Sequence, residues 1–238
     1  MLVTALIPAR YAATRFPGKL MQQLGGKSVI RRTYEATRET GLFHEVIVVT
    51  DSEDIEQEIL AAGGKAIRSQ HQHESGTDRI AEVAANLTTD LVINIQGDTP
   101  FIRKEPLGKL IELFEDPAVC VASMMQVLYK DEEINDPNFV KVAIDTNNNA
   151  LFFSRSRIPY LRDPNVAITY YEHIGVYAFR KQALLDFVSW PMGVLEAAEK
   201  IECLRYLEHR VSMKMLLVDY LGVEIDTPAD LIKAEKLL

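Results

Sequence analysis

Cysteine and long apolar runs are the first things that this sequence lacks. Cys120 and Cys203 are the only two cysteines among 238 residues, and they belong to no paired spacing. A disulfide framework and a structural zinc site are therefore unsupported. No apolar run approaches the roughly 20 residues that a membrane-spanning helix needs, and the first residues lack the basic start and cleavage site of a signal peptide. We therefore expect a cytoplasmic protein with no membrane partner.

Positive charge is also in short supply. The chain has 26 lysines and arginines against 34 aspartates and glutamates, which gives a formal net charge of -8. This balance argues against a nucleic-acid partner, because nonspecific binding to a phosphate backbone needs a basic surface. An anionic ligand has to be held by a few cations placed close together. Residues 8–19, PARYAATRFPGK, carry three of them on one loop, namely Arg10, Arg15 and Lys19.

The first half of the chain alternates between apolar runs and helical patterns. Buried strands are expected at residues 2–9, 45–50, 65–69 and 90–96. Helices are expected between them, at residues 28–40, 51–64 and 76–87. This alternation predicts an α/β fold, with a mostly parallel sheet flanked by helices and right-handed crossovers.

After residue 118 the rhythm changes, because apolar runs follow one another with few helical residues between them. Strands are expected here at residues 119–127, 139–145, 150–156, 172–179 and 213–220. Helices are expected at residues 181–190 and 195–210 and from Pro228 to the end. With no repeat or linker in view, we expect one domain, residues 1–238, with a β-rich excursion around residues 120–170.

The loop after the first strand is a candidate phosphate site. Ligands of open α/β sheets bind at the carboxyl ends of the strands, and arginine and lysine donate to phosphate oxygens. The loop matches neither the Walker A pattern nor the Rossmann glycine fingerprint. A solvated basic loop is the alternative, but Pro8, Pro17 and Gly18 shape the backbone around the cations, which favours phosphate binding.

Two aspartates are candidate magnesium ligands. Asp98 follows a strand in NIQGDTPF, and Asp226 precedes a helix start in VEIDTPADL. Magnesium is usually held by one or two carboxylates together with phosphate oxygens and water. The alternatives are a helix cap or a turn residue at Asp98 and a simple helix cap at Asp226.

Further polar residues are candidates for nucleotide and substrate binding. In HESGTDRIAE, Ser75 stands at a helix start, and Arg79 in the first turn opposes the helix dipole unless it has a specific partner. The alternative for Arg79 is an exposed pair with Asp78 or Glu82, and His71 and His73 are expected at the surface. The second half places polar residues within apolar runs, which suggests a pocket for a hydroxylated anion or, for any one of them, a satisfied core group: Arg155, Arg157, His173, Tyr177, Glu196, Glu199, Glu202 and Arg205.

An ordered set of motifs covers essentially the whole chain. These are PARYAATRFPGK, HESGTDR, NIQGDTP, FVKVAID, FFSRSRIP, HIGVYAF, LEAAEKIECLRYLE and DTPADL. Together they resemble the 3-deoxy-manno-octulosonate cytidylyltransferase (CMP-Kdo synthetase) family. The resemblance implies a nucleotidyltransferase-type, Rossmann-like fold whose β-rich excursion supplies dimer contacts. It also implies a magnesium-dependent, cytoplasmic homodimer that makes CMP-Kdo and pyrophosphate from CTP and 3-deoxy-D-manno-octulosonate, for lipopolysaccharide assembly.

The resemblance also assigns roles to residues. The CTP-binding residues would be Arg10, Arg15, Lys19, Ser75 and Arg79. The metal ligands would be Asp98 and Asp226, which with Lys19 form the catalytic set. The sugar-binding residues would be Gln96, Arg155, His173, Tyr177 and Glu202.

Three positions depart from the family pattern. Ala13 stands where serine is usual, Thr99 where glutamate is usual, and Cys203 where glutamine is usual. The last two leave open the same reaction on the 8-amino-3,8-dideoxy analogue or another sugar acid. Thr99 also keeps open a protein that binds nucleotide without turnover, although the full set of cations and carboxylates argues against it.

Overall fold

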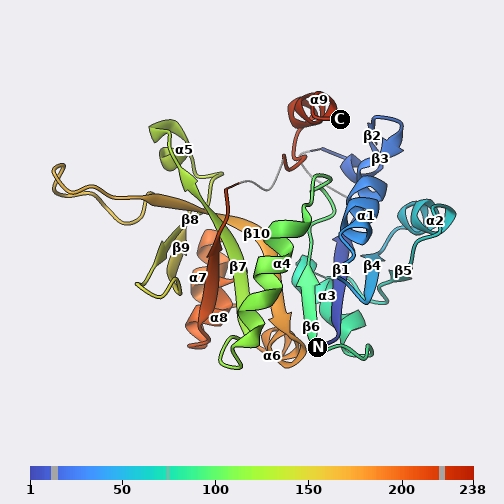
Figure 1. Cartoon of the computed structure of the whole chain (residues 1–238), viewed down its shortest axis with the longest axis horizontal. Coiled ribbons are helices and arrows are strands. Elements are labelled where there is room, and N and C mark those ends of the chain that lie inside the picture. Colours follow the sequence, from blue (N-terminus) through green and yellow to red (C-terminus); the bar gives the residue numbers. More distant parts are fainter. Residues whose placement is uncertain (12–15, 74, 220–222) are drawn as a thin grey trace. The chain divides into compact units, whose positions relative to one another are not determined.

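The computed structural model describes residues 1–11, 16–73, 75–219 and 223–238 (Figure 1). The chain forms two compact units. The first consists of Met1–Gly108, Arg180–Val188 and Leu221–Leu238, and the second of Lys109–Phe179 and Ser189–Tyr220. The second unit contains the whole excursion expected around residues 120–170, while the single-domain assignment stays a prediction. None of the described helices is long and apolar enough to cross a membrane.

The first unit is built around a parallel sheet. Its strands are β1 (Val3–Ala9), β2 (Gln23–Leu24), β3 (Lys27–Ser28), β4 (Glu45–Thr50), β5 (Ala66–Arg68) and β6 (Leu91–Asn94). Its helices are η1 (Lys19–Met21), α1 (Val29–Glu39), α2 (Glu53–Ala61), α3 (Gly76–Ala84), α6 (Lys181–Ser189) and α9 (Pro228–Glu235), and α4 (Lys104–Glu112) begins in it. The strand order β6-β1-β4-β5 is parallel throughout, which confirms the α/β prediction.

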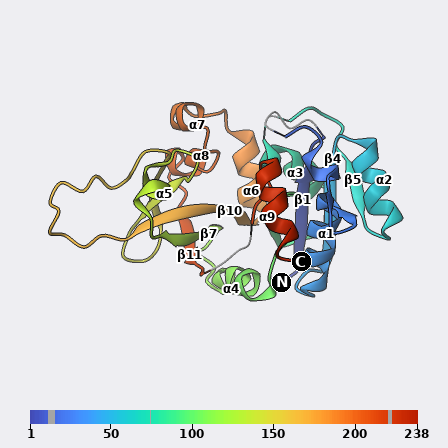
Figure 2. The same ribbon diagram turned by 90° about the horizontal axis from the view of Figure 1, so that it is seen from above.

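Helices cover both faces of this sheet. All seven residues of β1 are buried, as the continuous apolar run predicts for a strand covered on two sides. Helices α1 and α2 pack against each other and against β4, while α3 packs against β1 and β4 from the opposite face (Figure 2). Ser28 begins α1, and Ser52 and Ser75 begin α2 and α3, each with a side chain that accepts from a backbone N–H of the first turn.

The second unit has a mixed sheet. Its strands are β7 (Val121–Leu128), β8 (Lys141–Ile144), β9 (Ala150–Ser154), β10 (Tyr170–Arg180, whose last residue belongs to the first unit) and β11 (Met213–Leu217). Its helices are η2 (Leu113–Glu115), α5 (Asp131–Asn135), α7 (Val194–Glu199) and α8 (Leu204–Glu208). Strand β7 pairs with β11 in parallel and with β10 in the antiparallel sense, and the register of β10 shifts between Ile174 and Tyr177.

The helix predicted for residues 195–210 is wrong in one respect, because the structure breaks it into α7 and α8. Lys200 ends α7 with a left-handed backbone, at φ 55°. The carbonyls of Glu199 and Lys200 accept hydrogen bonds from the Arg155 guanidinium. A side chain from another segment therefore uses carbonyls that a continuous helix would have kept for itself. The pattern of apolar residues alone could not reveal this competition.

Candidate functional site

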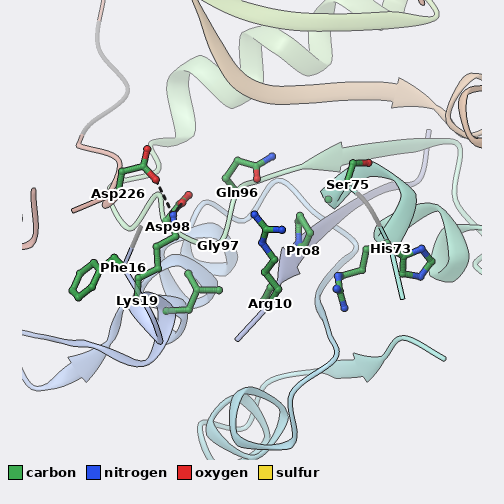
Figure 3. A pocket seen from close by; sticks show the side chains of 14 residues that line it. Pro8, Arg10, Phe16, Lys19, His73, Ser75, Gln96, Gly97, Asp98 and Asp226 are labelled. Carbon is green, nitrogen blue, oxygen red and sulfur yellow. Dashed lines mark hydrogen bonds and ion pairs between the residues drawn. The ribbon is translucent and has the colours of Figure 1, made fainter. Parts of the chain in front are cut away.

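A cavity of about 280 Å³ lies where five segments of the first unit meet. It is lined by Pro8, Ala9 and Arg10 at the end of β1, Phe16, Lys19 and Leu20 around η1, His73, Ser75, Gly76 and Arg79 at the start of α3, Gln96, Gly97 and Asp98 after β6, and Asp226 before α9 (Figure 3). Strands β1 and β6 are parallel neighbours, so their carboxyl ends meet at one edge of the sheet. The cavity therefore occupies the position where ligands of open α/β sheets bind.

Two glycines allow these segments to approach one another. A Cβ atom on Gly97 would lie 3.2 Å from the Pro8 carbonyl oxygen and 3.1 Å from Ile30 Cδ1. A Cβ atom on Gly76 would lie 3.1 Å from Pro8 Cγ. All three distances are shorter than ordinary van der Waals contacts, so a larger residue would push the start of α3 or the loop after β6 away from β1.

Lys19 joins the two predicted metal ligands. Its Nζ atom donates to the Asp98 carboxylate and to Asp226 Oδ1, the latter at 3.0 Å (Figure 3). Burial alone would lower the pKa of Lys19, but the Asp98 and Asp226 carboxylates outweigh it, so that the pKa is raised and the ammonium stays charged. The Ile225 N–H donates to the Asp98 carbonyl at 3.0 Å, which brings Asp226 to this place from the far end of the chain.

Asp226 is not the cap of the last helix, which was the alternative explanation of its position. Thr227 begins α9 instead, in a capping box in which its side chain accepts from the Asp230 N–H and the Asp230 carboxylate accepts from the Thr227 N–H. The Asp226 carboxylate accepts from the Lys19 ammonium instead.

The carboxylates of Asp98 and Asp226 suit a magnesium ion. Both reach the same ammonium group, so a single cation can contact both. Among the described residues, no three acidic, histidine or cysteine side chains gather closely enough to hold a metal by themselves. A pair of carboxylates that shares its ion with phosphate oxygens and water is the usual arrangement for magnesium.

The cations of the opening loop differ in their surroundings. The Arg10 side chain points into the cavity (Figure 3) and has no hydrogen bond or ion pair to any residue that the structure describes. It is exposed, as a ligand for an incoming anion should be. Arg15 and the variant position Ala13 lie outside the described residues.

Ser75 and Arg79 both line the cavity, and both have partners within the protein. Ser75 Oγ accepts from the Asp78 N–H at 3.1 Å and donates to the Asp78 carboxylate at 2.8 Å. The buried Arg79 guanidinium donates to Ser69 Oγ and to Asp51 Oδ2, each at 2.7 Å. The alternative in which Arg79 is exposed and pairs with Asp78 or Glu82 is therefore wrong. Arg79 ties the start of α3 to the segments that follow β4 and β5.

His73, which the sequence predicts to be a surface residue, lines the cavity instead. Its Nε2 atom lies 2.5 Å from Glu82 Oε2, and the pKa of Glu82 is lowered because hydrogen bonds from the Gln70 N–H and His73 outweigh the effect of burial. Asp51, Ser69, Gly76 and Gly97 are further contributors that the motifs did not single out. The glycines inside HESGTDR and NIQGD, Gly76 and Gly97, were the available signals among them.

Of the predicted sugar residues, Gln96 lines the cavity, and the other four belong to the second unit. There, the Arg155 guanidinium donates to the carbonyls of Glu199, Pro137 and Lys200 at 2.7, 2.9 and 3.4 Å. The Glu199 carboxylate accepts from Ser154 Oγ and from the Arg155 N–H. The Lys141 ammonium, on a fully buried side chain, donates to the Arg155 carbonyl at 2.6 Å. This network fixes the chain at residues 154–155.

His173 and Tyr177 lie together on β10, with ring centroids 5.4 Å apart. Burial lowers the pKa of His173 to about 4, so the ring is neutral near neutral pH. Burial raises the pKa of the Cys203 thiol well above its usual value, and Tyr177 is one of its hydrogen-bonding neighbours. The half-buried Glu202 follows in the segment between α7 and α8. Cys203 therefore has the environment of an unreactive thiol beside predicted sugar residues.

Thr99, the other departure from the family pattern, has a local role. Its hydroxyl donates to the Gln96 carbonyl at 2.5 Å, and the side chain is buried. It closes the turn that carries Asp98. A carboxylate is therefore not needed at this position to form the turn.

The chain resembles characterised families over its whole length. A family model described as cytidylyltransferase matches residues 4–215. The 3-deoxy-manno-octulosonate cytidylyltransferase of Flavobacterium johnsoniae is 54% identical over 241 residues, which cover 100% of this chain and 99% of that protein. The enzyme of the same name from Christiangramia forsetii is 54% identical over 99% of this chain and 96% of its own.

Solved structures agree with these relatives. A CMP:2-keto-3-deoxy-manno-octonic acid synthetase in complex with CTP superimposes with a TM-score of 0.94 at 38% identity, over 100% of this chain and 98% of that one. A 4-diphosphocytidyl-2C-methyl-D-erythritol synthase from Anaerococcus prevotii superimposes with a TM-score of 0.67 at 17% identity, over 99% of this chain and 97% of that one. At that identity the second likeness shows the fold alone.

Proposed function

The chain belongs to the 3-deoxy-manno-octulosonate cytidylyltransferase family, and on that premise we propose that it transfers CMP from CTP to the anomeric hydroxyl of 3-deoxy-D-manno-octulosonate. The products are CMP-Kdo, a precursor for lipopolysaccharide, and pyrophosphate. The observation that carries the proposal is the cluster of Arg10, Lys19, Asp98 and Asp226 in one cavity at the carboxyl end of a parallel sheet. It combines cations for a polyphosphate with carboxylates for the metal that accompanies it.

The residues of the first unit serve the phosphate end of the reaction. The sugar hydroxyl attacks the α-phosphate in line and pyrophosphate leaves, so that catalysis depends on positioning and charge neutralisation, with no covalent protein nucleophile. Arg10, which has no hydrogen bond or ion pair to the described residues, donates to phosphate oxygens from the cavity that it lines. Lys19 is the charged donor that offsets the negative charge developing on the leaving pyrophosphate.

Asp98 and Asp226 would hold magnesium in the proposed enzyme. Bound there, the ion would neutralise phosphate oxygens and lower the pKa of the attacking hydroxyl. Two hydrogen bonds position the two aspartates. The Thr99 hydroxyl closes the turn that aims Asp98, and the Ile225–Asp98 backbone hydrogen bond holds the segment that carries Asp226.

The residues of the second unit would serve the sugar acid. Arg155 offers the cation for its carboxylate, and the network of Glu199 and Lys141 fixes the backbone that presents it. His173, Tyr177 and Glu202 offer polar groups for its hydroxyls. The remaining predicted sugar residue, Gln96, lines the cavity of the first unit. We keep 3-deoxy-D-manno-octulosonate as the leading substrate. The two positions that depart from the family pattern, Cys203 and Thr99, are buried, and neither side chain carries a negative charge that would select an amino substituent.

We also propose that the enzyme is a cytoplasmic homodimer. The β-rich excursion exposes Tyr129 and Tyr160, whose relative exposures are 87% and 84%, beside a hollow lined by Leu128, Ile134 and Ile168. Large exposed apolar side chains of this kind favour a protein contact. Light scattering should give twice the chain mass of 26.8 kDa, and Tyr129→Asp with Tyr160→Asp should lower it; a monomeric native protein would end this part of the proposal.

The decisive assay for the reaction is pyrophosphate release with CTP and magnesium, offering 3-deoxy-D-manno-octulosonate and its 8-amino-3,8-dideoxy analogue in parallel. We expect release with the plain sugar, and CMP-Kdo as the product by mass spectrometry. The Asp54→Asn variant removes an exposed carboxylate on α2. Its rate in this assay shows the effect of losing a surface charge alone, for comparison with Asp98→Asn. Release only with the amino sugar would change the substrate, and silence with both sugars from protein that binds CTP would refute the proposed reaction.

A further inference from the structure

A buried serine touches the predicted sugar-binding histidine. Ser123 lies on β7, opposite the place where the register of β10 shifts between Ile174 and Tyr177, and it is fully buried. Its Oγ atom lies 3.0 Å from His173 Nε2, 3.0 Å from the Ile174 carbonyl oxygen and 2.9 Å from the Val176 carbonyl oxygen. One hydroxyl therefore has three close polar neighbours.

The carbonyls of Ile174 and Val176 determine whether Ser123 or His173 donates in the hydrogen bond between them. A hydroxyl has one proton to donate, and carbonyl oxygens can only accept. If Ser123 donated to His173, both carbonyl oxygens would face the hydroxyl oxygen with no proton between them. If Ser123 instead shares its one proton between the two carbonyl oxygens in a bifurcated bond, its lone pair is left to accept from His173, and every contact has a proton between its heavy atoms. The second arrangement requires a proton on His173 Nε2.

The other ring nitrogen of His173 then presents a lone pair. Burial keeps the ring neutral near neutral pH, so a proton on Nε2 leaves Nδ1 as an acceptor. Nδ1 makes no hydrogen bond to any residue that the structure describes. His173 is only partly buried, and no buried polar side-chain atom among the described residues lacks a partner, so we infer that Nδ1 reaches the surface of the unit. It is placed to accept a hydrogen bond from outside the protein.

We propose that Ser123 is a positioning residue that holds His173 in the Nε2–H form, so that Nδ1 accepts a hydrogen bond from a hydroxyl of the sugar acid. The role toward the sugar rests on the proposed function, whereas the proton position does not. The β10 register shift contributes to this arrangement, because it brings the Ile174 and Val176 carbonyl oxygens close to the same Ser123 hydroxyl. A bulge in a strand commonly re-aims a side chain at a functional site.

The proton position can be read directly by NMR on the free protein. In long-range 1H–15N spectra of 15N-histidine-labelled protein at pH 7.5, we expect His173 to show a protonated Nε2 and an unprotonated Nδ1. The chain has five histidines, and His173→Asn assigns the signals. A protonated Nδ1 in the wild type overturns the proposal, whatever the variants do.

Two variants test the link to the substrate. In Ser123→Ala, the Nε2–H of His173 loses the serine oxygen that accepts from it, so the Nδ1–H form should become populated. The KM for the sugar acid should then rise about three- to tenfold. The KM for CTP should stay unchanged. Ser123→Thr keeps the hydroxyl and should keep the wild-type tautomer. Thr37→Val removes a buried hydroxyl of α1, which donates to the Thr33 carbonyl of the same helix at 2.7 Å, and is the control for general loosening.

The possible results distinguish a failure of the Ser123–His173 proposal from a failure of the proposed function. A shifted tautomer in Ser123→Ala with an unchanged KM for the sugar acid overturns the role of Nδ1 in binding and leaves the proposed function intact. If the wild type releases no pyrophosphate with any sugar acid, the proposed function fails and the sugar-binding role fails with it. The NMR result still shows whether Ser123 fixes the ring. An unchanged tautomer in a folded Ser123→Ala protein overturns the positioning role.

Discussion

The neutral His173 ring should make the protein sensitive to acid. The pKa of this histidine falls from 6.5 to about 4 on folding because burial disfavours the charged ring. Between these two values the unfolded chain binds a proton that the folded protein does not bind. Stability is therefore complete above pH 6.5 and is lost as the pH falls toward 4.

The size of this loss follows from the two pKa values. At 1.36 kcal/mol for each pH unit, the complete loss is at most about 3 kcal/mol, and about 2 kcal/mol of it should have appeared by pH 5. Partial exposure of the ring to water makes these values upper limits. A typical domain has only about 5–15 kcal/mol in total, so the loss is large enough to measure.

The assay compares wild type with His173→Asn by urea unfolding at intervals from pH 7.5 to pH 5. Asn cannot titrate in this range, so the difference between the two free energies of unfolding isolates the histidine. Other groups whose pKa values are lowered in the folded protein, such as Glu82 and Glu199, should contribute equally to both proteins. We expect the wild type to lose stability relative to the variant as the pH falls. Parallel curves would refute the reasoning.

Three further predictions concern the site and its supports. Asp98→Asn should lower turnover at least about a hundredfold with the thermal midpoint unchanged; near-normal turnover would remove Asp98 from the metal site. Lys19→Met should bind Mn²⁺ more tightly than wild type in the absence of CTP, by titration calorimetry or EPR, because the ammonium no longer competes for two carboxylates, and equal affinity would contradict this. Arg155→Ala should raise the KM for the sugar acid and also lower the thermal midpoint, because three carbonyls lose their donor, whereas an unchanged KM would leave Arg155 with a structural role alone.

The phosphate end of the site could be predicted from the sequence because it depends on local rules and one topological rule. The continuous apolar runs that contain β1 and β6 predict buried strands, and the carboxyl ends of neighbouring parallel strands lie at the same edge of a sheet. Arg10 and Asp98 therefore had to lie near each other once the strand order was that of an open α/β sheet. The sequence could not place His73, because a histidine in a loop gives no sign of the cavity it faces.

The sugar end depends on contacts that no periodicity encodes. At the break between α7 and α8, the carbonyl of Glu199 accepts from Arg155, which lies 44 residues earlier in the chain. Ser123 of β7, which contacts the His173 ring, lies opposite a register shift in β10. Both are choices between competing hydrogen-bond partners. Such choices are settled by tertiary packing, so the residue types were predicted here while their geometry was not.

Asp226 shows how one pattern can satisfy two rules at once. The sequence DTPAD allows either Asp226 or Thr227 to cap the last helix, and local propensity does not favour one strongly over the other. The structure gives the cap to Thr227, because Asp230 can then close a capping box with it. That leaves Asp226 one residue outside the helix, where the Ile225–Asp98 hydrogen bond sets it beside Lys19. A residue that could have served only the helix thus becomes available to a cation, and the end of the chain becomes part of the site.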